Sequence, residues 1–151
     1  MPKPYTVCAL VLVAACAPSA HPAFDTAAET AKWVQLWRTY DLDLVDELFV
    51  TDSTVTYLSS EREGLILGID SVRVHHEGFG FVPGGAPLTS ELWLEDVYGE
   101  PRGDAATVTA AWFFGDRAAP RDSVQHGPVT FVYVWRADGW RIAHVQFGNY
   151  E

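Results

Sequence analysis

Two polar residues in the last strand-like segment are candidates for binding chemistry. His144 and Gln146 lie in the stretch GWRIAHVQFGNY, residues 139–150. They continue an every-second-residue spacing from Trp140 and Ile142, which predicts that all four side chains face the same side of a strand. A buried imidazole or amide without a partner costs about 1 to 3 kcal/mol. We therefore expect this pair to be satisfied either by internal waters and neighbouring hydroxyls or by a bound ligand.

The neighbouring histidines of HHE, residues 75–77, are the other residues typical of a ligand site. Successive side chains on a helix diverge by about 100°, so His75 and His76 are poorly placed to share one metal ion. The sequence also lacks the motifs for phosphate loops, serine nucleophile elbows and dinucleotide-binding glycines. We expect neither a metal site nor a cofactor.

The first sixteen residues, MPKPYTVCALVLVAAC, predict export and a lipid anchor. One cation, Lys3, precedes an apolar run at residues 7–15 that is far shorter than the roughly 20 residues of a membrane-spanning helix. Such a segment is typical of a cleaved signal peptide. VAAC resembles the lipobox of bacterial lipoproteins, which implies acylation of Cys16 and membrane attachment in the cell envelope, at the outer membrane facing the periplasm in a Gram-negative host. Ordinary cleavage after Ala17, which releases a secreted protein, is the alternative.

We expect a signal peptide at residues 1–15, a lipidated tether at 16–25 and one domain at 26–151. The two cysteines, Cys8 and Cys16, both precede that domain, so we expect no disulfide or thiolate chemistry in it. The chain carries 20 acidic and 10 basic residues, a net charge of −10. Such a surface repels phosphate backbones, and nucleic acid is therefore not an expected partner.

Apolar periodicity predicts helices in the first half of the domain. TAAE, with Thr26 as the N-cap, is typical of a capping box, and Trp33, Leu36, Trp37 and Tyr40 follow at helical spacing. Two further helices are expected after Asp43 and Asp70, and a short strand at 53–58. From residue 88 the apolar period is two, which predicts strands at 89–98, 105–114, 124–136 and 140–148. Short connections make these strands antiparallel neighbours, and the fold class is α+β.

The predicted strands are apolar on both faces. In VTFVYVW, residues 129–135, neither set of alternate positions is consistently polar. A sheet with one solvated face would alternate apolar with polar residues, so both faces are expected to be covered. Helices and a pocket would cover one face. A second copy of the protein would cover the other and form a homodimer through the sheet, although the tether and loops are an alternative cover.

Four stretches resemble, in order and spacing, successive blocks of the nuclear transport factor 2-like superfamily in its SnoaL-like bacterial branch. They are YDLDLVDELFVTDSTVTYL, LGIDSVRVHHEGF, DAATVTAAWFF and GPVTFVYVWRADGWRIAHVQF, and the resemblance covers about residues 26–150. It implies a cone, in which a strongly bent antiparallel sheet and three helices enclose a pocket. His144 and Gln146 match positions that point into this cone, where the association domain of calmodulin-dependent kinase carries HxH.

Another member of this fold class suggests a catalytic alternative. Tyr40, Asp41, Tyr57 and His76 resemble, in order and approximate spacing, the tyrosine–aspartate pair, strand tyrosine and helix histidine of scytalone dehydratase. There, tyrosines polarise a carbonyl through water while histidine removes an adjacent proton. The position of that enzyme's second histidine falls near Trp112, which departs from the pattern. The matching residues of ketosteroid isomerase and limonene-epoxide hydrolase are also missing.

The resulting hypothesis is a membrane-anchored protein that binds a small apolar or amphipathic molecule in a cone-shaped pocket. The expected pocket residues are Trp37, Tyr57, Trp112, His144 and Gln146. One alternative is a cofactor-independent dehydratase or isomerase with His76 or His144 as base and Tyr57 as donor. The other is an assembly module whose cone is filled by its own side chains. A cavity above about 300 Å³ would favour binding or catalysis, and a filled cone would favour assembly.

Overall fold

The computed structural model describes residues 21–88 and 90–150. The expected signal peptide and the lipidation site Cys16 lie outside these residues. No helix among the described residues is long and apolar enough to cross a membrane. The helices are α1 (Thr26–Thr39), α2 (Asp43–Leu48), α3 (Ile69–Glu77) and the short 3-10 helix η1 (Arg121–Ser123). The strands are β1 (Thr56–Leu58), β2 (Ile66–Leu67), β3 (Glu91–Arg102), β4 (Ala105–Gly115), β5 (Gln125–Arg136) and β6 (Gly139–Phe147).

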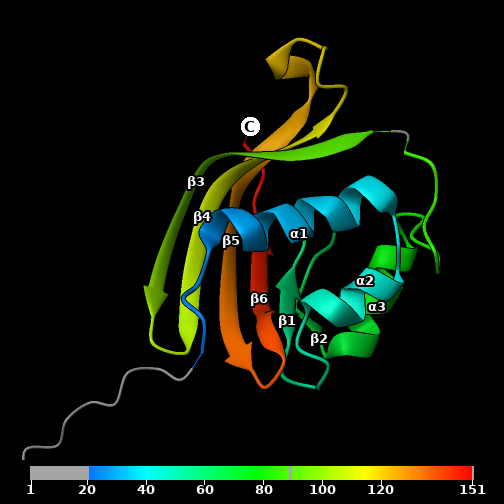
Figure 1. Cartoon of the computed structure of the whole chain (residues 1–151). Coiled ribbons are helices and arrows are strands. Elements are labelled where there is room, and N and C mark those ends of the chain that lie inside the picture. Colours follow the sequence, from blue (N-terminus) through cyan, green and yellow to red (C-terminus); the bar gives the residue numbers. More distant parts are fainter. Residues whose placement is uncertain (1–20, 89, 151) are drawn as a thin grey trace, which may run out of the picture.

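One curved six-stranded sheet, in the order β2-β1-β6-β5-β4-β3, forms the frame of the molecule. Adjacent strands in this sheet are antiparallel, except that β1 and β6 run parallel to each other. The three α-helices lie on the concave side of the sheet (Figure 1). The predicted α+β cone is therefore confirmed. The two-residue strand β2 was not predicted, because its length is too short to show a period.

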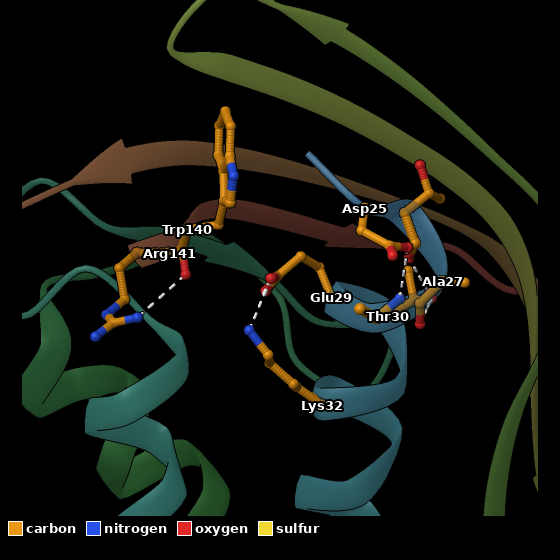
Figure 2. Close-up of polar contacts among 9 residues, drawn as sticks. Asp25, Ala27, Glu29, Thr30, Lys32, Trp140 and Arg141 are labelled. Carbon is orange, nitrogen blue, oxygen red and sulfur yellow. Dashed lines mark hydrogen bonds and ion pairs between the residues drawn. The ribbon is translucent and has the colours of Figure 1, made fainter. Parts of the chain in front are cut away.

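Helix α1 begins one residue earlier than the capping box predicted. The side chain of Asp25, not of Thr26, accepts a hydrogen bond of 3.0 Å from the backbone N–H of Ala28 (Figure 2). A carboxylate at this position also interacts favourably with the positive end of the helix dipole. Glu29 does not close the box either, because its carboxylate pairs with Lys32 at 2.7 Å.

Aromatic side chains from the helices fill the concave side of the sheet. The ring centroid of Trp33 lies 5.0 Å from that of Phe131 on β5, and Trp37 lies 5.1 Å from Phe81. Trp33, Phe131 and the neighbouring Val145 on β6 are completely buried. Burial of aromatic side chains at this density contributes the largest part of the hydrophobic stabilisation of a small domain.

The two faces of β5 differ as its alternation predicts. Val129, Phe131 and Tyr133 point into the core and are at most 2 % exposed. The intervening Thr130 and Val132 are only half-buried on the opposite side, which we call the outer sheet face. The outer sheet face also includes exposed Thr107 and Thr109 on β4, half-buried Leu58 on β1 and exposed Leu67 on β2.

The described part of the expected tether packs against the sheet. The ring of His21 stacks on Trp135 with centroids 4.8 Å apart, and its Nε2 lies 2.8 Å from a carboxylate oxygen of Asp104. Phe24 contacts Trp140 edge to face at 5.0 Å. Residues 21–24 therefore pack against the sheet, while residues 16–20 of the expected tether lie outside the described residues. Two aromatic residues within the sequence HPAF supply the apolar contacts that hold this segment in place.

Candidate functional site

The cone retains one narrow cleft among the aromatic side chains, which we call the aromatic cleft. Its volume is about 50 Å³. That volume holds a few water molecules but is far below the roughly 300 Å³ of a pocket for a drug-sized ligand. The apolar lining residues are Trp37, Tyr57, Phe79, Leu92, Trp112, Phe114 and Phe147, and the polar ones are Ser59, Ser60, Glu61 and Gln125.

Hydrogen bonds join the polar residues at the edge of the aromatic cleft. The amide of Gln125 at the start of β5 donates to the carboxylate of Glu61 and, at 3.5 Å, to the side-chain oxygen of Asn149. The amide of Asn149 in turn donates to the carbonyl of Ser60 at 3.3 Å. We call these four residues the clasp, because they connect the loop after β1 with β5 and the C-terminal residues.

Three of the expected pocket residues line the aromatic cleft. Trp37 comes from α1, Tyr57 from β1 and Trp112 from β4. The indole N–H of Trp112 donates to the carbonyl of Gly148 at 2.8 Å, which fixes its ring. The indole nitrogen of Trp37 is buried without a partner among the described residues.

His144 and Gln146 do not face the cone, and the prediction that they do is wrong. The pairing of β5 with β6 shifts by one residue, because Val132 pairs with His144 whereas Tyr133 pairs with Ile142. The extra residue is a β-bulge that reverses which side chains point inward. Beyond it, Val145 and Phe147 are buried in the interior, and Gln146 is exposed on the outer sheet face. His144 is half-buried there, and its Nδ1 lies 2.7 Å from the hydroxyl of Thr56.

His76 lies in the last turn of α3, where its side chain is completely buried, and it does not line the aromatic cleft. Its Nδ1 donates to the carbonyl of Val72 at 2.8 Å, so the lone pair lies on Nε2, which has no partner in the described structure. Burial lowers the pKa of His76 to about 4. The imidazole is therefore neutral at pH 7 and packs against the rings of Tyr57, at 5.7 Å, and Phe81, at 5.1 Å.

Tyr40 and Asp41 have structural contacts instead of access to the aromatic cleft. Tyr40 ends α1 in the left-handed conformation, with φ of 52°, and its ring stacks on Phe81 at 4.5 Å. The carboxylate of Asp41 accepts from the backbone N–H groups of Asp43 and Gly84, both at 3.0 Å. These two residues organise the junction of α1 with α2 and with the loop after α3.

The expected acid–base partners are separated by this geometry. Tyr57 pairs with Val145 and faces the interior, whereas His144 lies on the other side of the same sheet, so they cannot act on one substrate. Burial raises the pKa of Tyr57 above its ordinary value, which keeps the phenol neutral. His76 shares an aromatic environment with Tyr57, but a substrate in the aromatic cleft does not reach its Nε2.

His75, which the sequence analysis considered only as a metal ligand, is buried beside Tyr57. Its ring packs 4.9 Å from that of Tyr57, and its Nε2 is buried without a partner in the described structure. Burial, with a smaller contribution from the charge of Arg62, lowers the pKa of His75. The described residues contain no group of three or more His, Cys, Asp or Glu that could hold a metal ion.

The comparisons with known proteins concern the fold. No protein-family model and no curated protein matches the sequence. Among solved structures, a nuclear transport factor 2-like superfamily protein from Salmonella enterica is 20% identical, with a TM-score of 0.65 over 82% of this chain and 87% of that one. A proposed dehydratase of the same family from Streptomyces avermitilis is 15% identical, with a TM-score of 0.66 over 83% of this chain and 94% of that one.

The association domain of C. elegans CaMKII is a third similar structure, at 17% identity. Its TM-score is 0.63, and the match covers 81% of this chain and 91% of that one. The names of these three proteins describe different roles, but each structure superposes on most of this chain. The agreement, together with the strand order described above, shows that the chain has the nuclear transport factor 2-like fold.

Proposed function

We propose that the domain is a non-catalytic assembly module that pairs with a second copy of itself through the outer sheet face. The observation that carries this proposal is the contrast between the two sides of the sheet. The concave side is filled by the protein's own aromatic residues and leaves a cleft of about 50 Å³. The convex side carries Leu58, Val132 and Val134, which are only half-buried in the single chain.

The composition of the outer sheet face supports pairing between like surfaces. Thr109 and Thr130 lie opposite each other at its centre, and Thr107 pairs with Val132 in the next row. Short β-branched side chains make the centre of this face nearly flat, while Glu100 and Arg102 lie on β3 beside it. A second copy can cover the centre by a two-fold operation. The similar CaMKII structure is, by its name, an association domain.

Substitution at the centre of the outer sheet face tests this proposal. Thr130→Arg introduces a charge that would be buried against its own copy in a two-fold dimer, so the dimer should dissociate at least tenfold more readily. Val82→Arg is a matched control, because Val82 is 44% exposed in a loop away from the sheet. Sedimentation equilibrium measures the dimer dissociation constant of each variant and of the wild-type protein. A monomeric wild-type protein, or a Thr130→Arg protein that associates as tightly as wild type, would contradict the proposal.

We propose ligand binding in the aromatic cleft as a second function. It is supported by the seven apolar lining residues beside the clasp. The ligand would be a single small apolar ring that enters when the clasp opens, because the closed cleft of about 50 Å³ holds only a few water molecules. Glu61→Ala should strengthen binding of toluene, read from the NMR shift of the Trp112 indole proton. Glu63→Ala, in the same loop but outside the cleft lining, should have no effect, and equal responses would contradict this function.

We further propose that Cys16 is acylated and holds the domain on a membrane of the cell envelope. The support is the sequence VAAC after a short apolar run. Mass spectrometry of detergent-extracted protein should find a mature chain that begins at Cys16 and carries acyl groups. Cys16→Ala should move the protein to the soluble fraction. An unmodified Cys16, or a mature chain that starts after Ala17, would contradict the anchor and leave the assembly proposal unaffected.

A further inference from the structure

A groove between α1 and β3 is much larger than the aromatic cleft. Its volume is about 620 Å³, against about 50 Å³ for the cleft inside the cone. Figure 1 shows α1 lying across the sheet with β3 running beside it. We call this the α1–β3 groove, and its volume lies within the range of small-molecule sites. It is lined by Thr26, Ala27, Thr30, Ala31, Val34, Gln35, Arg38, Trp93, Leu94, Val97 and Arg117.

The floor of the α1–β3 groove is apolar along the helix. Ala27, Ala31 and Val34 follow at i, i+4 and i+7, which places them in one row on a helix. This row is distinct from the core-facing row of α1 that contains Trp33 and Trp37. Helix α1 therefore has a second apolar face, whose small side chains leave room beside them.

The other wall of the groove results from an irregularity in β3. The pairing of β3 with β4 shifts between Glu95 and Tyr98, and Asp96 adopts a positive φ of 52°. β3 is an edge strand, and a bulge there bends the strand and changes the direction of its side chains. Val97 lines the groove and is 39% exposed.

Two positive charges lie in this groove of an otherwise acidic protein. Arg38 and Arg117 make no ion pair with a carboxylate within the described residues. The guanidinium of Arg117 lies 5.1 Å from the ring centroid of Trp93. Glu95, which acts electrostatically on Arg117, already accepts hydrogen bonds from Trp93 and Arg121. The net charge of the chain is −10, so two unpaired guanidinium groups in one groove favour an anionic ligand.

We propose that the α1–β3 groove binds a single-chain amphipathic carboxylate. Its head would lie within the field of Arg38 and Arg117 and accept hydrogen bonds from their guanidinium groups, which form strong contacts with carboxylates. Its apolar chain would lie along Ala31 and Ala27 toward Val97. The helix rises about 16 Å between Ala27 and Arg38, which sets the length of the chain at that of a medium-chain fatty acid. This site is independent of the aromatic cleft and of the outer sheet face.

Titration with dodecanoate below its micelle concentration tests the proposal, with dodecanol as the uncharged probe. Binding is followed by amide chemical shifts in NMR spectra. Dodecanoate should shift the signals of residues 27–38 and 93–97, and dodecanol should bind about tenfold more weakly, the effect of losing one charge-assisted contact. Arg38→Gln and Arg117→Gln should each weaken dodecanoate binding and leave dodecanol binding unchanged. Arg102→Gln is the control, because Arg102 pairs with Glu100 at 2.7 Å and does not line the groove.

Ala31→Trp, which fills the groove, should abolish binding of both probes, with circular dichroism used to establish that the variant is folded. Three results would overturn the proposal. They are the absence of binding by wild-type protein, equal affinities for dodecanoate and dodecanol, and shifts that cluster at Trp112 and Phe147 in the aromatic cleft instead of along α1.

Discussion

The stability of the domain should fall as the pH is lowered, because His76 is buried in its neutral form. The ordinary pKa of histidine is 6.5, and burial lowers that of His76 to about 4 in the folded protein. Between these values the unfolded chain binds a proton that the folded chain does not. The contribution of His76 is therefore fully present above pH 6.5 and is lost as the pH falls through 4.

The size of this effect follows from the two pKa values. Each pKa unit is equivalent to 1.36 kcal/mol, so the difference corresponds to a loss of about 2 kcal/mol by pH 5 and about 3 kcal/mol by pH 4. No reduction for solvent screening is needed, because His76 has 0% exposure. A loss of 3 kcal/mol is a large part of the 5 to 15 kcal/mol that is typical of a whole domain.

His76→Phe isolates this contribution from that of other groups. Phenylalanine fits among the rings of Trp37, Phe49, Tyr57 and Phe81 and removes the unpartnered Nε2, so the variant should lie within about 1.5 kcal/mol of wild type at pH 7.5. Urea unfolding followed by tryptophan fluorescence gives the free energy of unfolding at each pH. The difference between wild type and variant should change by about 3 kcal/mol between pH 7.5 and 4 in favour of the variant.

This comparison removes the contributions of His75 and His144, whose pKa values burial also lowers and which both proteins contain. A histidine NMR titration provides a second measurement, in which the ring signal of His76 should stay unchanged above pH 5. A difference in stability that is constant with pH, or a His76 signal that titrates near pH 6.5, would refute the reasoning.

Three further predictions concern other parts of the structure. The hydrogen bond of His21 Nδ1 with the carbonyl of Pro22, reinforced by Asp104, raises the pKa of His21. The contribution of protonated His21 to the docking of residues 21–24 should therefore be present below pH 6.5 and be lost as the pH rises through the raised pKa. Asp104→Asn should weaken this docking, read from amide exchange of these residues, and an unchanged pH profile would contradict it. Gly127→Ala should destabilise the domain by about 1 to 3 kcal/mol, because the added Cβ would lie 1.9 Å from the carbonyl oxygen of Gly148. A free energy of unfolding equal to that of wild type would exclude this clash. Trp33→Ala should cost about 3 to 5 kcal/mol in the same urea assay, and a loss below 1 kcal/mol would mean that the core does not depend on this ring.

Much of the fold follows from local patterns in the sequence. The apolar row of α1 and the alternation within β5 are visible because each repeats over several turns or residue pairs. The cap of α1 was predicted one residue late, because Asp25 and Thr26 are both good N-caps and only tertiary geometry selects between them. β1 is shorter than predicted, since residues 53 and 54 form a turn and the strand begins only at Thr56.

The candidate site could be predicted less well, because it depends on a single bulge. The sequence does contain a sign of this bulge. Apolar residues occupy the even positions Trp140 and Ile142 but the odd positions Val145 and Phe147, so the alternation shifts by one residue between them. Following the apolar residues instead of the fixed period would have placed His144 and Gln146 outside. The volume of the cone interior could not be predicted, because it depends on how aromatic rings from separate elements pack together.

The parallel pairing of β1 with β6 makes the assembly of the core depend on the last of the described strands along the chain. Tyr57 lies beside Val145, although the whole of α3 and three long strands separate them along the chain. Closing so long a loop carries an entropic cost before any contact compensates it, and such topologies fold slowly. Until β6 is in place, the aromatic residues of α1 have no complete surface to pack on and stay open to binding by chaperones.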